Sequence, residues 1–254
     1  MDDLTALRLQ IEWGADEALE EAPVDRLHRQ AAPSAPASPP PLAGGGQGEA
    51  APRISPAERA FQAAAGASTL EELRAAIAGF DGCALRDTAS HLVFAEGDPT
   101  ASLLVIGEPP GADDDRSGTA VAGAAGAYLD RMLGSIGLQR EALLLTPLIP
   151  WRPPGDRPPS PGELVLCLPF LHRLIAIVGP RRLLLLGMLA ARSLLPQSTS
   201  RRRPRGAWMD TTVGVPALPT FSPAELMRAP KDRRAAWADL RLLRRTLDAD
   251  ASGG

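Results

Sequence analysis

Four short apolar runs, each followed by a helical pattern, constrain the fold of this 254-residue chain more than any other feature. They are ASLLVIG (101–107), ALLLTPLIP (142–150), RRLLLLG (181–187) and VPALPTF (215–221). Their apolar residues are continuous rather than alternating, which is typical of strands buried on both faces of a parallel sheet. Because helices cover those faces, we expect an α/β fold of three α/β/α layers with a central four-stranded, mainly parallel sheet.

The loops that follow the four strands form the expected site. Ligands of open α/β sheets bind outside the carboxyl ends of the strands. Here the loops read GEPPGADDD, TPLIPWRPPGDRPP, GMLAA and SPAELMRAP. We expect the functional side chains to come from these four segments.

Composition divides the chain into four parts. Residues 1–30 read as an acidic helix, from the rough helical spacing of their apolar residues. Residues 31–57 contain seven prolines and no aromatic residue, so they are expected to form a flexible, disordered linker. We expect the folded domain over 58–247 and a disordered tail over 248–254.

Charge is distributed unevenly along the chain. Residues 1–25 carry eight acidic residues and one arginine, whereas residues 181–245 carry fourteen Arg and Lys residues and four acidic ones. Such a basic segment favours a polyanionic partner, with nucleic acid first, although a solvated helix face has the same composition. The acidic N-terminal helix is expected to bind a protein partner or to fold back over the basic surface.

Cysteine usage and hydropathy favour the cytoplasm. Two cysteines, Cys83 and Cys167, exclude a disulfide framework and fit a reducing compartment. The N-terminus is acidic and lacks the apolar core of a signal peptide. The longest apolar run, over 183–191, is too short to span a bilayer. We expect a cytoplasmic monomer that does not bind membranes.

Several stretches within residues 68–245 resemble the uracil-DNA glycosylase superfamily, and they are most similar to its family 4 branch. In chain order they are FDGCALRDTASHLVFAEGDP, GEPPGADDDRSG, GAYLDRML, PWRPPGDRPPSPGELVLCLPF and RGAW. The resemblance implies a hydrolase of DNA base excision repair. Such an enzyme cleaves the N-glycosidic bond of uracil in single- or double-stranded DNA after the base has left the stack.

The resemblance also implies a DNA-binding surface. Relatives insert an apolar residue from the loop after the fourth strand into the space of the extruded nucleotide, and Leu226 and Met227 occupy that place. The alternative is a Leu-Met pair packed beneath the last helix. Five cationic residues are expected to contact phosphates: Arg228, Lys231, Arg203, Arg205 and Arg152.

The catalytic carboxylate of the family is retained. Glu108 matches the glutamate that orients water and stabilises positive charge on the sugar, and Asp114 follows in an acidic stretch that the family shares. Pro109 and Gly111 belong to the same turn of the base pocket. Pro109 stiffens this turn and removes a backbone N–H.

Three other pocket positions depart from the family. Val121 replaces the phenylalanine that stacks on uracil, and stacking contributes about 1–3 kcal/mol per base. Pro147 replaces the asparagine that reads the base edge. Ser222 replaces the histidine that donates to the developing oxyanion, and loss of such a donor costs about 2.7–4 kcal/mol.

The iron–sulfur cluster of the family needs four cysteine thiolates. Cys83 and Cys167 match two of them, whereas Phe80 and Trp151 stand at the other two positions. We therefore expect no cluster, metal or other cofactor, and two cysteines buried as small apolar residues.

These departures leave three functions open. The first is a uracil-DNA glycosylase-like repair protein whose activity is weak or lost. The second is a catalytically inactive pseudoenzyme that binds DNA or a protein partner. The third is a glycosylase with altered base specificity, because a roomier pocket could admit other deaminated bases.

Overall fold

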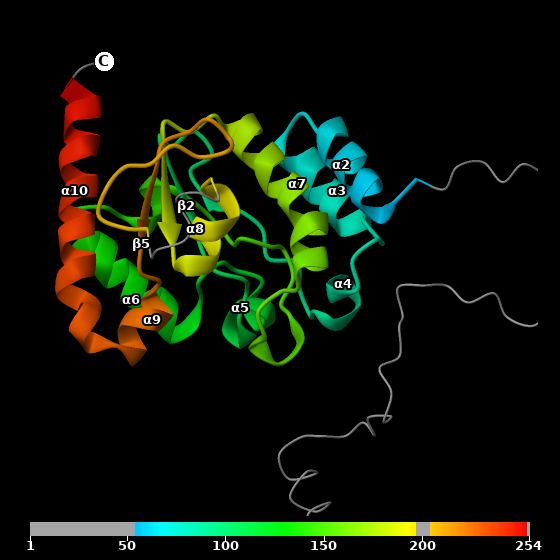
Figure 1. Cartoon of the computed structure of the whole chain (residues 1–254), viewed down its shortest axis with the longest axis horizontal. Helices are drawn as coiled ribbons and strands as arrows, with labels where there is room; N and C mark the ends of the chain where they lie inside the picture. Colours follow the sequence, from blue (N-terminus) through cyan, green and yellow to red (C-terminus); the bar gives the residue numbers. More distant parts are fainter. Residues whose placement is uncertain (1–53, 197–203, 253–254) are drawn as a thin grey trace, which may run out of the picture. The chain divides into compact units, whose positions relative to one another are not determined.

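The computed structural model of the chain describes residues 54–196 and 204–252. The expected acidic helix, most of the expected linker and Arg203 lie outside these residues. The described residues belong to a unit that starts at residue 51, and they form a mixed sheet with helices on both faces (Figure 1).

Four strands are parallel and match the four apolar runs. They are β2 (Leu103–Ile106), β3 (Leu144–Thr146), β4 (Arg182–Leu186) and β5 (Ala217–Thr220). The order across the sheet is β1-β3-β2-β4-β5, and β2 pairs with both β3 and β4. The parallel α/β architecture is therefore confirmed.

A fifth strand corrects the expected number of four. β1 (Glu96–Gly97) pairs antiparallel with β3 at the edge of the sheet. It is two residues long, so it carries no hydrophobic period that a sequence could show. Gly97 has a φ of +104° and lies so close to the carbonyl oxygen of Leu143 that any side chain would collide with it.

One face of the sheet is covered by helices from three parts of the chain, residues 56–88, 161–178 and 188–194. Their buried side chains form one core with the sheet residues Leu104, Leu183 and Leu185. These helices are α2 (Pro56–Gly66), α3 (Leu70–Gly79), α4 (Leu85–Thr88), α7 (Pro161–Val178) and α8 (Met188–Leu194).

The opposite face is covered by α6 (Gly123–Gly134), α9 (Pro223–Arg228) and α10 (Arg233–Ser252) (Figure 1). Their core takes up the alternate strand residues, including Val105 and Leu184, because successive side chains of a strand point to opposite faces. The remaining short elements are α5 (Ala112–Ser117), η1 (Arg140–Ala142), η2 (Pro154–Asp156) and η3 (Pro230–Asp232).

Both ends of the folded domain differ from the expected boundaries. α2 begins at Pro56, with Ser55 as its N-cap. At the other end α10 continues to Ser252, so residues 248–252 are helical and not a tail. This last part of α10 is held by Arg182 of β4, whose Nε and Nη2 each donate to the Asp250 carboxylate at 2.8 Å.

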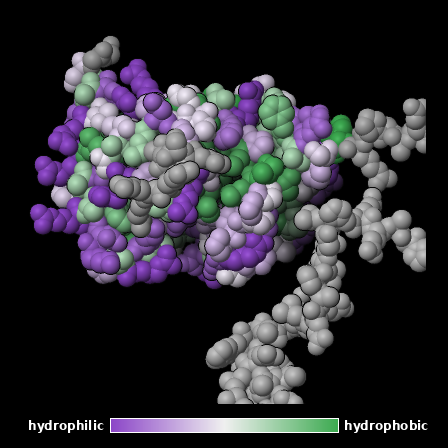
Figure 2. Space-filling view, viewed as in Figure 1, coloured by the Kyte–Doolittle hydropathy of each residue, from purple (hydrophilic) through white to green (hydrophobic). Residues whose placement is uncertain are grey.

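The helix α7 is long and apolar enough, by length and composition, to cross a membrane. In this fold it packs against α2 and α3, with Cys167, Phe170 and Leu174 buried in the core. A central helix of a folded domain meets the same criteria. Its outer face keeps Val165 exposed, and Figure 2 shows hydrophobic side chains gathered over α7.

Candidate functional site

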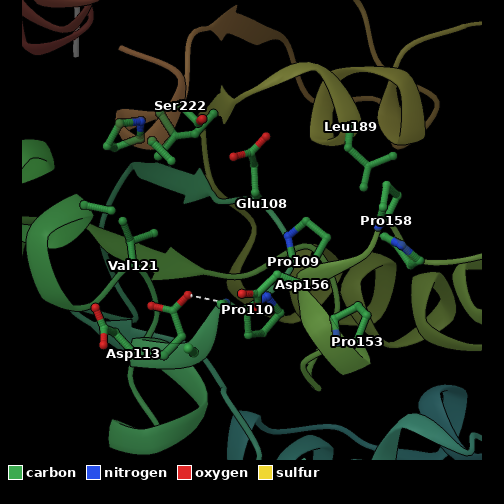
Figure 3. A pocket seen from close by; sticks show the side chains of 18 of the residues that line it. Glu108, Pro109, Pro110, Asp113, Val121, Pro153, Asp156, Pro158, Leu189 and Ser222 are labelled. Carbon is green, nitrogen blue, oxygen red and sulfur yellow. Dashed lines mark hydrogen bonds between the residues drawn. The ribbon is translucent and has the colours of Figure 1, made fainter. Parts of the chain in front are cut away.

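A cavity of about 680 Å³ lies at the carboxyl ends of the parallel strands (Figure 3). Its volume is within the range of small-molecule sites. All four expected loops contribute to it: 108–114 after β2, 153–159 after β3, 188–189 after β4 and 222–224 after β5. The expected position of the site is where the largest of the described cavities lies.

Glu108 lies at the centre of this cavity. It follows β2 by two residues and is partly buried beside the turn between β4 and α8. Figure 3 shows its carboxylate rising into the space between Ser222 and Leu189. At Gly187 in that turn a Cβ atom would lie 2.6 Å from Glu108 Oε1. The absence of a side chain at residue 187 therefore makes room for the carboxylate.

Asp114 lines the cavity, but its contacts give it a positioning role. One carboxylate oxygen accepts from the Gly111 N–H at 2.8 Å, and the other accepts from the Ala122 N–H at 2.5 Å. The side chain thus ties the loop after β2 to the start of α6. Both oxygens are engaged by the backbone, and a catalytic role for Asp114 stays a prediction.

Asp115 is buried and ties a third segment to the same loop. Its Oδ1 accepts from the N–H groups of Ser90 at 2.7 Å and His91 at 3.1 Å. Burial opposes ionisation, but these hydrogen bonds prevail and hold the pKa of Asp115 below its ordinary value. Asp115 therefore stays ionised and fixes the backbone behind Asp114.

Val121 lines the cavity with an unusual backbone. Its φ of +52° lies in the left-handed region, which β-branched residues rarely adopt. Arg140 holds this conformation by donating to the carbonyl oxygens of Ala120 at 3.1 Å and Val121 at 2.9 Å. Val121 occupies the place predicted for it, and the strain marks this segment as one that the surrounding structure constrains.

Arg140 was not singled out from the sequence. Besides the two carbonyl oxygens, it contacts Glu96 and Asp130 at 2.9 Å each, and its side chain is 21% exposed. Burial raises the pKa of Glu96, and the Arg140 guanidinium counteracts this. No local motif marks Arg140, because its partners come from three distant segments.

Pro147 is not part of the cavity, which corrects the expected base pocket. It is buried and lines a separate, much smaller cavity with Phe170 and Leu174 of α7. β3 ends at Thr146, whose carbonyl oxygen accepts from the Gly107 N–H at 2.8 Å. The next residue therefore turns toward the α7 side of the sheet.

Ser222 lines the cavity and is the N-cap of α9. Its Oγ accepts from the Glu225 N–H at 3.2 Å, and its own N–H donates to the Glu225 carboxylate at 2.9 Å. This reciprocal pair is a capping box, which the sequence SPAE signals directly. Ser222 is 2% exposed, so its hydroxyl serves first to start the helix.

Three arginines at the rim of the cavity are Arg157, Arg192 and Arg228. Arg157 makes a two-fold ion pair with Glu163, at 2.6 and 2.8 Å. No ion pair to Arg192 or Arg228 is found among the described residues. Of the three, only Arg228 was predicted from the sequence to contact phosphates.

Of the two residues expected to be inserted into DNA, Leu226 and Met227, only one is exposed. Leu226 is 1% exposed and packs in the core of α9 and α10, so the prediction that it is inserted into DNA is wrong. It faces inward because α9 is helical through this position, which sends neighbouring side chains in different directions. Met227 is 43% exposed and stays available.

Of the cationic residues expected to contact phosphates, some are exposed and others pair with carboxylates. Arg228 and Lys231 are exposed beside Met227. Arg205 instead points inward, where it pairs with the buried Asp239 at 3.4 Å. Arg152 pairs with Asp156 at 2.7 Å and keeps a 28% exposed side chain. Arg205 thus has a structural partner but keeps a 32% exposed side chain, so its contact with phosphate stays a prediction.

The positions of the family's iron–sulfur ligands lie together in the core. Phe80, Cys83, Trp151 and Cys167 belong to one hydrophobic cluster and are each at most 5% exposed. The hydrogen bond with Cys83, together with burial, raises the pKa of the Cys167 thiol. Two thiols and two aromatic rings do not supply four thiolates. Within the described ranges, no three His, Cys, Asp or Glu residues are grouped to hold a metal ion.

Comparison with known proteins agrees with this geometry. A family model described as the uracil DNA glycosylase superfamily matches residues 94–241. The type-4 uracil-DNA glycosylase of Pyrobaculum aerophilum is 32% identical over 178 residues, which cover 67% of this chain and 91% of that relative. That of Sulfurisphaera tokodaii is 29% identical over 184 residues, covering 69% and 84%. The protein is thus a member of the uracil DNA glycosylase superfamily.

Proposed function

We propose that this protein removes a deaminated base, uracil among them, from DNA by hydrolysis of the N-glycosidic bond, at a rate that is strongly reduced. Membership of the superfamily supports a DNA-repair glycosylase with DNA as its partner. The relatives named above are type-4 uracil-DNA glycosylases. Weak activity is the part that rests on the pocket.

One observation carries the proposal. Among the described residues that line the cavity there is no Phe, Tyr, Trp, His, Asn or Gln. The pocket thus offers no ring for stacking and no side-chain amide for reading the edge of a base. Its walls near Glu108 are formed by Val121, Leu186 and Leu189.

Glu108 would supply the chemistry that is left. As the bond between the sugar C1′ and the base nitrogen breaks, positive charge develops on the sugar and negative charge on the base. A carboxylate at the end of β2 stabilises the first charge and accepts a proton from the water that adds to C1′. The negative charge on the leaving base would lack a histidine donor.

A second candidate is a DNA-binding protein without activity. It is favoured by the contacts of Ser222, whose oxygen accepts the capping hydrogen bond of α9. A third candidate, altered base choice, is favoured by the volume of the cavity and by the apolar side chains of Val121, Leu186 and Leu189 in its lining. In each case we propose that the protein works without an iron–sulfur cluster, which the iron and sulfide content of anaerobically purified protein tests.

The experiment is uracil release from a single-stranded oligonucleotide with protein in excess. We expect slow release by the wild-type protein and none by Glu108→Gln. Glu141→Gln, which changes an exposed glutamate outside the cavity, should match the wild type. Equal rates for wild type and Glu108→Gln would contradict the role of Glu108. Tight binding without any release would select the inactive DNA-binding protein.

A further inference from the structure

A second groove lies on the other side of α9, between α6 and α10. Its volume is about 230 Å³. The residues that line it include the aromatic side chains Tyr128 and Trp237, the cations Arg131 and Arg233, and the apolar Leu226. No acidic residue is among the described residues that line it. The groove is therefore both aromatic and positively charged.

Two guanidinium groups lie against one aromatic ring in this groove. The guanidinium carbon of Arg131 lies 5.2 Å from the centre of the Tyr128 ring, and that of Arg233 lies 5.7 Å from it. Among the described residues neither arginine has a carboxylate partner, so their N–H groups can still bind an anion. Trp237 follows Arg233 by one helical turn of α10 and is 42% exposed.

The groove is adjacent to the main cavity through one short helix. Leu226 of α9 lines the groove, whereas Ala224 and Arg228 of the same helix line the main cavity. The exposed Met227 lies in the sequence between Leu226, which lines the groove, and Arg228, which lines the main cavity. A strand whose nucleotide enters the main cavity could therefore continue across α9 into the groove.

We propose that this groove is a second nucleobase-binding site, where an unpaired base next to the target nucleotide stacks on Trp237. Arg131 and Arg233 would hold the adjoining phosphates. Base stacking on aromatic rings beside a positively charged path is how single strands are bound without sequence preference. The inference rests on the proposed function in one respect, that the partner is DNA. It predicts a preference for single-stranded DNA.

The same groove could instead accept an acidic peptide with an apolar side chain. The position of the groove next to the main cavity, across α9, favours a nucleic acid, because a strand bound at the main cavity would reach it and a peptide needs no such neighbour. The two ligands are distinguished by testing both with the full-length protein.

The test compares two uracil-free oligothymidylates, of about four and about twelve nucleotides, within the site sizes known for single-strand binding. Their affinity is measured by fluorescence anisotropy for the wild type, Trp237→Ala and Trp237→Phe. We expect Trp237→Ala to weaken binding of the longer strand about fivefold or more and to leave the shorter one unchanged. Trp237→Phe should retain most of the affinity.

Phe61→Ala is the matched control. Phe61 is 65% exposed on α2, which lies at the opposite end of the described unit from α10 (Figure 1). This variant loses an exposed aromatic ring but should bind both strands like the wild type.

Several results would overturn the inference. Unchanged binding by Trp237→Ala would show that no base stacks there. Equal losses for both lengths would place the defect in the main cavity or in folding. If Trp237→Ala weakened the binding of a labelled peptide of residues 1–30 and left DNA binding unchanged, the groove would be assigned to a peptide. Failure of the wild type to bind either strand would also contradict the proposed function, because DNA would not be the partner. The other outcomes contradict the second site and leave the proposed function standing.

Discussion

At the scale of single residues, the site depends on one carboxylate and on what leaves room for it. Glu108 reaches the centre of the cavity because residue 187 has no side chain. The sequence predicted Glu108 from its place after a buried strand and from the family resemblance. It could not indicate Gly187, because the collision involves two strands that are far apart in the chain.

Gly187→Ala should abolish uracil release as completely as Glu108→Gln. The new Cβ would meet the Glu108 carboxylate at 2.6 Å, in a backbone with a φ of +88°. A second glycine with a positive φ serves as a control, because its substitution shows what backbone strain does without the collision. Gly214 has a φ of +77° and nothing within 4 Å of its Cβ position, so Gly214→Ala places a side chain on a positive-φ backbone without the collision.

The two variants are compared by thermal unfolding and by release of uracil. We expect Gly214→Ala to lose about 1 kcal/mol of stability from its positive φ. Gly187→Ala should lose about 1–3 kcal/mol, because a φ of +88° with a ψ of +169° lies in a region that glycine alone adopts readily. Only Gly187→Ala should lose the activity. Full activity in Gly187→Ala would mean that Glu108 does not need its present position.

At the scale of elements, the hydrophobic pattern predicted the long strands and helices and missed the short or polar ones. The four parallel strands follow their apolar runs, whereas β1 is too short to show a pattern. The end of α10 was missed because what ties it to the sheet, the ion pair of Arg182 with Asp250, is a tertiary contact that a local pattern does not show. The capping box at Ser222 is a local pattern, and the sequence SPAE indicates it without any tertiary contact.

Leu226 shows why an exposed loop cannot be inferred from composition. The segment LMRAP looked like a loop tip, but residues 223–228 form a helix whose inward side is fixed by packing on α10. A stretch of six residues is too short for its buried side to be identified from a hydrophobic period. Met227, the adjacent residue, is left as the exposed one.

The start of α7 carries a pH-dependent contribution to stability. The hydrogen-bonded ion pair with Arg157, together with the capping box with Ser160, lowers the pKa of the Glu163 carboxyl to about 2. A lowered folded-state pKa stabilises the protein above the unfolded pKa of about 4.3. That stability is lost as pH falls toward 2.

Glu163→Gln should therefore reduce the free energy of unfolding at pH 7 by roughly 1–2 kcal/mol, after allowance for the half-exposed Arg157. The difference from wild type should shrink between about pH 5 and pH 2, where Glu163 of the wild type takes up its proton. Urea unfolding across this range measures it, with Glu141→Gln as the control. A difference that stays constant down to pH 2 would contradict the assignment.

At the scale of the whole molecule, the site was predictable in position and less so in detail. The carboxyl ends of parallel strands meet at one edge of the sheet, so the four loops converge whatever their sequence. Which side chains point into the cavity depends on turns of one or two residues. Val121 points in, whereas Pro147, directly after β3, lines another cavity.

We propose that this protein keeps the fold and the carboxylate of its family while it has lost recognition of the base. A site that hydrogen-bonds its substrate rejects an analogue by about 10⁴-fold or more, whereas an apolar pocket discriminates by only about 10–200-fold. The described lining of the cavity around Glu108 offers no amide or ring for such recognition. Base selectivity should therefore be low.

The most direct test measures single-turnover release of uracil and of hypoxanthine from otherwise identical single-stranded oligonucleotides. We predict slow, Glu108-dependent release of both bases, with rates that differ by no more than about 200-fold. Fast release of uracil, at a rate about 10⁴-fold or more above that of hypoxanthine, would show that the pocket still recognises uracil and would contradict this account.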